Sequence, residues 1–359
     1  MTSPTAVLLL EDGTRFEGLP FGAAGEAMGD AVFYTGVVGY QEVITSPSYR
    51  GTLAVFTYPV IGSYGVNEED NESPAACVAG VVIKEYSRTY SNFRATGALE
   101  DFLVAHGVAG IRGVDTRAVA VHLREHGAMR GIIASGDVDE RTLLDTLRRD
   151  QSLIKADLVR DLPRQEPVTP HGEPAHRLAI LDLGVSRSLL AHLALLGCSV
   201  ELLPPTASPD QLLATKPDGV VVAGGPGDPR VLDYAVATVK ALVGKVPLLG
   251  IGLGHQALAL ALGCTVERMA LGHHGVNYPV KELATGDSEI TVQQHSFVVE
   301  ADPLPDGVEI THVNLNDKTV EGIRSTTHRA ASVQFHPSLD ETGRPHRLFE
   351  AFLGRHDHQ

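Results

Sequence analysis

A glycine-rich turn between two apolar segments is the stretch of this sequence that could carry chemistry. Residues 248–251 form a short apolar run, Gly252 interrupts it, and residues 253–263 are rich in leucine and alanine over the length of a helix. The pattern predicts a buried strand, a sharp turn and a buried helix. In a nucleophile elbow of this shape, the central residue projects from a strained turn and the backbone N–H of the next residue, here Leu253, faces a developing oxyanion. Glycine at the centre offers no nucleophilic side chain.

Two other segments carry residues that could belong to the same site. The sequence Gly-Gly-Pro-Gly-Asp-Pro at residues 224–229 permits positive φ angles and a close approach of the backbone to a ligand. A turn with only a structural role fits the same spacing. His336 directly follows the last predicted strand, at residues 331–335.

The elements that must position these residues alternate between strands and helices. Predicted strands lie at residues 178–182, 200–203, 218–223 and 248–251. Predicted helices lie between them, at residues 186–196, 209–214 and 232–243. This order predicts an α/β domain with a mainly parallel sheet flanked by helices, whose site lies beyond the carboxyl ends of the strands.

The first half of the chain predicts a β-rich α+β domain. Residues 6–17 are predicted to form two strands around an Asp-Gly turn, and residues 31–43 a strand, with a polar turn or loop after it at residues 45–50. Residues 116–123 are predicted to form a helix. At the start of that helix, Asp115 and Arg117 could form an ion pair that holds the fold. Residues 160–175 contain four prolines and few apolar residues, which is typical of a linker. The predicted domains are therefore 1–159 and 176–359.

Composition excludes several classes of function. The formal net charge of −15 argues against nucleic acid and anionic membrane as partners, because phosphate binding needs a basic face. The three cysteines are far apart, so they predict neither a disulfide framework nor a zinc site, and a reducing cytoplasm fits them. No apolar run is long enough for a signal peptide or a membrane span.

Several strings in the sequence resemble those of one family. Gly-Ile-x-Leu-Gly-His-Gln at residues 250–256 is similar to the class I, triad-type glutamine amidotransferases, in which x is the cysteine that attacks the glutamine amide. The string at residues 271–280 narrows the resemblance to the small subunit of carbamoyl phosphate synthase. Residues 35–42, Thr-Gly-x-x-Gly-Tyr-Gln-Glu, and the Asp-Thr-Arg at residues 115–117 also resemble that family. The resemblance covers nearly the whole chain.

The resemblance assigns a role to residues of this chain. His336 matches the base of the triad, and the backbones of Gly225 and Leu253 match the oxyanion donors. The resemblance also implies a glutamine pocket, in which Ser48 reaches the site from the first domain. The residues that match the family's glutamine pocket are Ser48, Gly225, Gly227, Leu253, Gln256, Gln294, Ser296 and Phe297.

Four of the matched positions depart from the family pattern. Gly252 stands at the nucleophile position, and Ser338 stands where the family has the glutamate that orients the histidine. Gln294 and Ser296 replace a smaller asparagine and a glycine in the pocket. We therefore expect glutamine binding to be weak or absent and glutamine hydrolysis to be lost, because a thiolate, a base and an orienting carboxylate act together. An engineered change would account for Gly252 alone, whereas the other three departures favour natural decay.

No other residue is expected to replace the nucleophile. Cys264 lies twelve residues beyond Gly252, about 18 Å along a continuous helix. Ser338 would need its own base and oxyanion hole. Because position 252 offers no thiol and position 338 no carboxylate, we expect His336 to be a hydrogen-bonded residue at a strand end without a catalytic role. The adjacent His273 and His274 are interpreted as framework, because neighbouring strand residues point to opposite faces. No metal is predicted.

The resemblance implies a partner and leaves two classes of function open. The partner is a large carbamoyl phosphate synthase subunit, which uses ATP and Mg²⁺ to form carbamoyl phosphate for pyrimidine and arginine biosynthesis; no cofactor is expected on this chain. In the first reading, the chain is a subunit of that enzyme, which takes ammonia from solution. In the second, it is a noncatalytic regulatory or scaffolding paralogue of an intact small subunit.

Overall fold

The chain divides into two compact units, each described here by itself. In the computed structural model, the described residues are 5–136, 139–149, 156–167, 170, 172–340 and 342–354. Unit 1 comprises residues 1–156 with residues 270–274, and unit 2 comprises residues 157–269 with residues 275–359. Within the described residues, no helix has the length and apolar character needed to cross a membrane.

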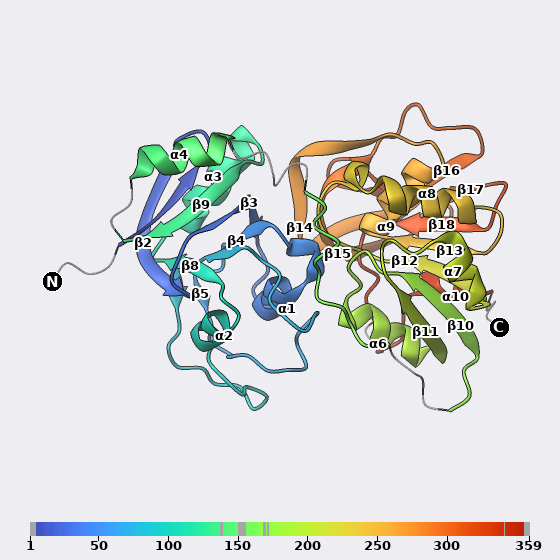
Figure 1. The fold of residues 1–359 in the computed structure, drawn as a ribbon, viewed down its shortest axis with the longest axis horizontal. Coiled ribbons are helices and arrows are strands. Elements are labelled where there is room, and N and C mark those ends of the chain that lie inside the picture. Colours follow the sequence, from blue (N-terminus) through green and yellow to red (C-terminus); the bar gives the residue numbers. More distant parts are fainter. Residues whose placement is uncertain are drawn as a thin grey trace. The chain divides into compact units, whose positions relative to one another are not determined.

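Unit 1 is a closed β-barrel with helices packed against it (Figure 1). Its strands run in the order β1-β2-β8-β6-β4-β3-β9. They are β1 Ala6–Leu10, β2 Arg15–Gly22, β3 Ala27–Tyr34, β4 Thr52–Phe56, β6 Gly80–Val82, β8 Ala109–Arg112 and β9 Arg130–Ser135, and a separate pair joins β5 Val60–Ile61 to β7 Glu85–Tyr86. The helices are α1 Tyr40–Thr45, α2 Leu99–Ala105, α3 Thr116–His126 and α4 Glu140–Arg149, with a 3₁₀ turn at Pro47–Tyr49.

Side-chain alternation along the barrel strands explains how the helices attach. In β1, Leu8 and Leu10 belong to a core cluster that collects residues from strands all around the barrel, together with Leu123 of α3. Val7 and Leu9 point the other way and pack with Leu147 of α4 and its neighbours. The predicted β-rich α+β domain is confirmed. The prediction for residues 31–43 was wrong in its second part, because residues 40–45 form α1, whose apolar side chains are buried against the barrel.

Unit 2 contains a nine-stranded sheet in the order β11-β10-β12-β13-β18-β17-β15-β14-β16. The strands are β10 His176–Leu181, β11 Cys198–Leu203, β12 Gly219–Val222, β13 Leu248–Ile251, β14 Val266–Glu282, β15 Ser288–Val299, β16 Val308–Asn314, β17 Val320–Ser325 and β18 Ala330–Val333. Strands β11, β10, β12, β13 and β18 pair in parallel, whereas β18 with β17, β17 with β16 and β15, and β14 with β16 pair antiparallel.

Helices cover both faces of the parallel part of this sheet (Figure 1). They are α6 Arg187–Leu195, α7 Pro209–Ala214, α8 Asp233–Leu242, α9 Leu253–Ala261 and α10 Arg347–Leu353, with a 3₁₀ turn at Pro229–Val231. Ala179 and Leu181 of β10 face α7, α8 and α9, whereas Leu178 and Ile180 face α6 and α10. The predicted α/β architecture is confirmed, and the antiparallel strands extend it at one edge.

The start of unit 2 differs from the predicted linker. The sequence placed residues up to 159 in the first domain and residues 160–175 in a linker. In the structure, Val159 is buried in the core of unit 2. Arg164 forms an ion pair with the buried Asp182, with 3.0 Å between Nη1 and Oδ2, and also donates to the carbonyl oxygen of Asp182. Specific packing therefore holds part of this proline-rich stretch, which composition alone does not reveal; residues 168, 169 and 171 of the predicted linker lie outside the described residues.

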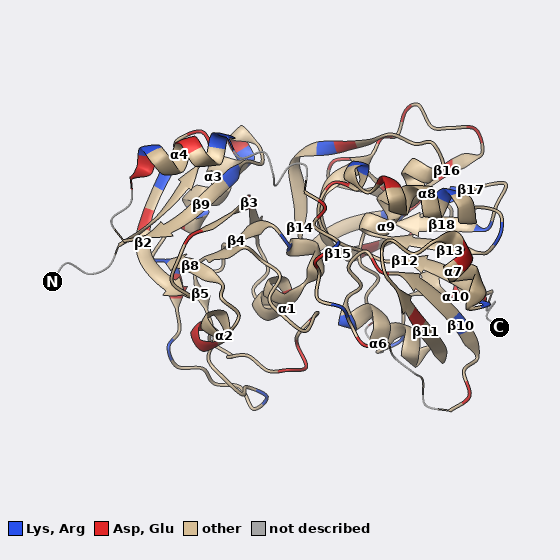
Figure 2. Ribbon diagram, viewed as in Figure 1, with Lys and Arg blue, Asp and Glu red and all other residues tan. Residues whose placement is uncertain are grey.

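Charged residues of both signs are interspersed over the two units (Figure 2). Several of the basic side chains are paired with acidic ones, such as Arg130 with Glu11 at 2.8 Å and Arg324 with Glu309 at 2.8 Å. The Arg324–Glu309 pair is exposed, and a pair of that kind contributes little to stability, whereas Arg130 is buried.

Candidate functional site

A sharp turn connects β13 to α9 at the carboxyl edge of the parallel sheet. Gly252 adopts φ 59° and ψ −118°, a conformation that side-chain-bearing residues rarely adopt. Its N–H donates to the carbonyl oxygen of Val333 in β18 at 3.0 Å, and its own carbonyl oxygen accepts from His255 N–H at 3.0 Å. The predicted strand, turn and helix are therefore present, and Gly252 occupies the tip of an elbow.

Glycines allow the neighbouring turn to approach this elbow closely. A Cβ atom on Gly225 would lie 2.0 Å from the carbonyl oxygen of Leu183 and 3.0 Å from Cδ2 of Leu253. A Cβ atom on Gly254 would lie 1.9 Å from the carbonyl oxygen of Val222. These distances are far below van der Waals contact, so only glycine fits at either position. The two residues predicted as oxyanion donors, Gly225 and Leu253, consequently lie side by side.

The N–H groups of Gly225 and Leu253 have no acceptor within the described part of the chain. Leu253 is the first residue of α9, and the first N–H groups of a helix have no intrahelical partner. Donors of this kind favour an anion or a developing oxyanion. The elbow therefore keeps the backbone features that the chemistry of amide hydrolysis needs.

A side chain at position 252 would face His336 without a clash. A Cβ atom built on Gly252 would lie 3.4 Å from Cα of Gly224 and 3.9 Å from Cε1 of His336, both ordinary contacts. The turn of residues 224–229 and the strand end at His336 thus meet at the elbow. At position 252 itself only the side chain is missing, because the space for it is present.

The ring of His336 lies in a partly buried position beyond β18. Its backbone N–H donates to the carbonyl oxygen of Val292 at 2.9 Å, which ties the strand end to β15. The ring borders a small pocket of about 20 Å³, room for about one water molecule, shared with Ser186 and Ser188. Desolvation by the surrounding protein lowers the pKa of His336 to about 4, so the imidazole is neutral at pH 7.

No carboxylate is paired with the His336 ring among the residues described. Ser338, at the position of the orienting glutamate in the family pattern, is exposed, and its hydroxyl donates at 3.5 Å to the main-chain carbonyl oxygen of His336. That contact is with the backbone and at the limit of hydrogen-bond length. Ser338 therefore supplies nothing that would hold or charge the imidazole.

The predicted pocket residues divide between two faces of β15. Gln294 and Ser296 are partly exposed and lie on the same face as Val292, the residue that is paired with His336. The Phe297 side chain points the other way, into a cluster with Cys264 and its neighbours. Cys264 therefore belongs to this core rather than to the elbow. The glutamine-binding roles of Gln294, Ser296 and Phe297 stay predictions.

Gln256 is buried and its side chain is used within the protein. Its amide Nε2 donates to the carbonyl oxygen of Phe297 and to Oε1 of Gln334, each at 2.9 Å. The sequence did not single out Gln334, because nothing about its strand position indicates a buried amide pair. These bonds tie α9 to β15 and to the residue that follows β18, so Gln256 positions the helix that begins at the elbow. Its predicted contact with glutamine stays a prediction.

Two buried histidines outside the triad position, His255 and His274, are also neutral at pH 7. Nδ1 of His255 lies 2.8 Å from the hydroxyl of Ser332, and burial lowers the pKa of His255 to about 3. Within unit 1, His274 packs against the ring of Tyr49, and burial lowers its pKa to about 3. His273 is buried as well. These side chains are part of the packed framework.

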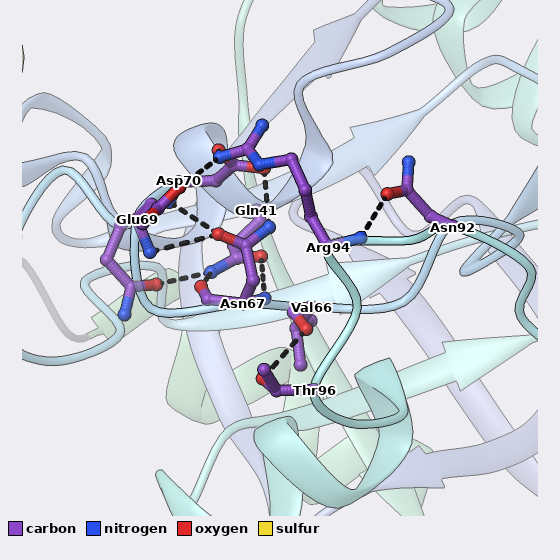
Figure 3. A network of polar contacts seen from close by, with 9 residues as sticks. Gln41, Val66, Asn67, Glu69, Asp70, Asn92, Arg94 and Thr96 are labelled. Carbon is purple, nitrogen blue, oxygen red and sulfur yellow. Dashed lines mark hydrogen bonds and ion pairs between the residues drawn. The ribbon is translucent and has the colours of Figure 1, made fainter.

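Ser48 lies in unit 1, in the 3₁₀ turn that follows α1. It is partly exposed, and its neighbour Tyr49 is buried. Gln41 anchors α1 by accepting from Asn67 N–H at 3.0 Å and donating to Oδ1 of Asn71 at 2.6 Å (Figure 3). The network continues through Asp70 to Arg94. It fixes the helix that leads into Ser48, whose predicted contact with glutamine stays a prediction.

The fold and the elbow define a class of protein. Residues 179–355 match the family model described as "Glutamine amidotransferase class-I", and residues 8–133 match "Carbamoyl-phosphate synthase small chain, CPSase domain". The two matches together cover most of the chain. They place unit 2 among proteins with a class I amidotransferase domain, which agrees with its parallel sheet and elbow.

Full-length relatives then define the family. The chain is 41% identical to the carbamoyl phosphate synthase small chain of Syntrophotalea carbinolica over 97% of this chain and 96% of the relative. It is 43% identical to the small chain of Akkermansia muciniphila over 97% of this chain and 96% of the relative, and 43% identical to that of Symbiobacterium thermophilum over 96% of each. The chain belongs to the carbamoyl phosphate synthase small chain family.

Proposed function

We propose that this chain is the small subunit of a carbamoyl phosphate synthase whose own glutaminase step has been lost, so that the complex uses free ammonia. One observation carries the proposal: Gly252 sits at the tip of an otherwise intact elbow, with room for a side chain 3.9 Å from His336 and no side chain to fill it. Amide hydrolysis by this route begins with attack by a thiolate, so its first step has no reactant here.

Two further features support the loss. His336 has a pKa lowered to about 4, and Ser338 offers it no carboxylate that would favour the charged imidazolium. In a serine protease, removal of the nucleophile or its base lowers kcat by about a million-fold, and the remaining rate comes from the oxyanion hole and from binding. The donors at Gly225 and Leu253 could therefore sustain only a small residual rate.

The intact framework of both units supports a continuing role in a complex. The glycines that bring the residue 224–229 turn to the elbow are retained, and a packed barrel is retained in unit 1. The partner would be the large subunit, which would bind ATP and Mg²⁺. The pathway role in pyrimidine and arginine biosynthesis and a cytoplasmic location belong to this same proposal.

The test is to combine the chain with its large subunit and to measure carbamoyl phosphate formation with glutamine or with ammonium as nitrogen source. We expect turnover with ammonium and turnover at least a thousandfold lower with glutamine. Comparable rates with both sources would overturn the loss of glutaminase activity. Failure to stimulate the large subunit with either source, together with displacement of an intact small subunit, would favour the noncatalytic paralogue instead.

A further inference from the structure

A second hollow lies in unit 1, and none of its lining residues belongs to the elbow. Its volume is about 570 Å³, which is within the range of small-molecule pockets, roughly 300–1,000 Å³. One side is a face of α3 formed by Arg117, Ala120, Val121 and Arg124. The residues that complete it are Phe33, Thr35, Thr57, Pro59, Lys84, Asp115 and Thr116.

Three cations converge on this hollow in a protein of net charge −15. Lys84, Arg117 and Arg124 are exposed, and none of them lies within 4.0 Å of a carboxylate among the described residues. Arg94 and Arg130 of the same unit, by contrast, are both paired with acidic side chains. Figure 2 shows basic residues on α3. Three like charges around one hollow repel each other, and an anion would relieve that repulsion.

The single carboxylate at the hollow is already engaged. Oδ1 of Asp115 accepts from the N–H of Ala118 at 3.0 Å and so caps the start of α3. The ion pair predicted between Asp115 and Arg117 is absent from the described structure, because the carboxylate caps the helix instead. Arg117 is therefore left available to a ligand, and the local balance of three cations and one carboxylate favours a dianion.

The spacing and the lining indicate the kind of anion. Arg117 and Arg124 are seven residues apart on one helix, which places them two turns or about 10 Å from each other. Phe33 and Val121 add apolar surface to the lining of the hollow. Arginine forks bind phosphate oxygens in pairs, and an apolar floor favours a ring or hydrocarbon body.

We propose that this hollow is a binding site for a small organic phosphate, held by Lys84, Arg117 and Arg124 with its apolar part against Phe33 and Val121. The site is independent of the elbow and of glutamine hydrolysis. It gives unit 1 a ligand-binding role of its own.

The test uses isothermal titration calorimetry on the full chain at 50 mM salt, with phenyl phosphate, pyrophosphate and benzoate as probes. We expect phenyl phosphate to bind more tightly than pyrophosphate, which lacks the ring, and more tightly than benzoate, which carries one charge. Raising the salt to 200 mM should weaken the binding of each probe.

Arg117→Ala and Arg124→Ala should each weaken phenyl phosphate binding about tenfold, the effect of losing one charge-assisted hydrogen bond. Arg141→Ala is the matched control, because Arg141 is an exposed arginine on α4, another helix of unit 1, and its loss changes the net charge equally. It should leave binding unchanged, and thermal melting should show that all three variants are folded.

Two results would overturn the assignment. The first is the absence of saturable binding of phenyl phosphate and pyrophosphate at 10 mM. The second is binding that Arg117→Ala and Arg141→Ala affect equally, which would indicate a general charge effect. If pyrophosphate binds as tightly as phenyl phosphate, the organic part of the proposed ligand is wrong. If Arg117→Ala keeps phosphate affinity but loses the large subunit, the cations serve a protein interface and the proposal fails.

Discussion

Restoring a cysteine at the elbow is the most informative perturbation of this protein. The variants are Gly252→Cys, Gly252→Cys/Ser338→Glu and the matched control Gly252→Cys/Ser338→Gln, which adds the same bulk without charge. The geometry accepts the thiol, because Cβ would make only ordinary contacts, the nearest 3.4 Å away. The positive φ of 59° adds a strain of about 1–3 kcal/mol to a residue other than glycine. Gly252→Cys should therefore fold with a modestly lower melting temperature.

The magnitude of the recovered activity depends on His336. Attack by the thiol requires the imidazole to accept its proton, yet the pKa of His336 is lowered from 6.5 to about 4. That difference disfavours the imidazolium by about 3 kcal/mol, or a factor of more than a hundred. A carboxylate beside the ring favours the charged form and offsets part of this penalty. We predict that Gly252→Cys/Ser338→Glu releases glutamate about a hundredfold faster than Gly252→Cys.

The assay is glutamate release from saturating glutamine at pH 7.5, by the isolated chain and by its complex with the large subunit. Gly252→Cys/Ser338→Gln should match Gly252→Cys. If Gly252→Cys alone reaches the rate of the glutamate-bearing variant, the reasoning about His336 is refuted, and the glycine would resemble a single engineered change. If Gly252→Cys/Ser338→Gln releases glutamate as fast as Gly252→Cys/Ser338→Glu, the size of the side chain at position 338 rather than its charge sets the rate.

The remaining predictions concern stability, measured by urea unfolding. Burial lowers the pKa of His255 from 6.5 to about 3, so the unfolded chain binds a proton below about pH 6.5 that the folded chain does not bind. The free energy of unfolding therefore falls as the pH decreases. His255→Asn should remove about 2 kcal/mol of that fall between pH 7 and pH 5. An unchanged pH slope would contradict this. Gly225→Ala should lower the free energy of unfolding by more than about 3 kcal/mol, because the new Cβ would lie 2.0 Å from a backbone oxygen. Gly227→Ala, whose nearest contact would be at 3.5 Å, should lower it by about 1–2 kcal/mol because of its positive φ. Equal losses in the two variants would argue against the close approach of the turn to Leu183. Arg164→Ala should cost about 1–3 kcal/mol because it removes the partner of the buried Asp182, and no change would show that this ion pair is solvated.

The elements around the elbow could be predicted well from the sequence. Short apolar runs, glycine turns and helical spacing gave α7 at residues 209–214 and located β13, Gly252 and α9 correctly. Such signals are local, because a buried parallel strand and its following helix are each apolar over a characteristic length. The same reasoning found the hairpin of β1 and β2.

Tertiary packing decided the features that the sequence did not reveal. The strand interpretation of residues 40–43 failed because α1, which contains them, is too short to show a helical period, and its apolar residues are buried on several sides. The predicted linker failed at Val159 and Arg164 because their partners lie elsewhere in unit 2. The Gln256–Gln334 pair joins residues 78 apart, which no local pattern encodes.

The most direct measurement of the central claim is an isotope competition in the complex of this chain with its large subunit. Glutamine labelled with ¹⁵N in the side-chain amide and unlabelled ammonium are supplied together, and the nitrogen of the carbamoyl phosphate is analysed by mass spectrometry. An ammonia-dependent complex gives product that carries almost entirely the ammonium nitrogen, with no matching release of glutamate. Product that carries mainly the label would contradict the account, because Gly252 would then stand at a working amide-hydrolysing site.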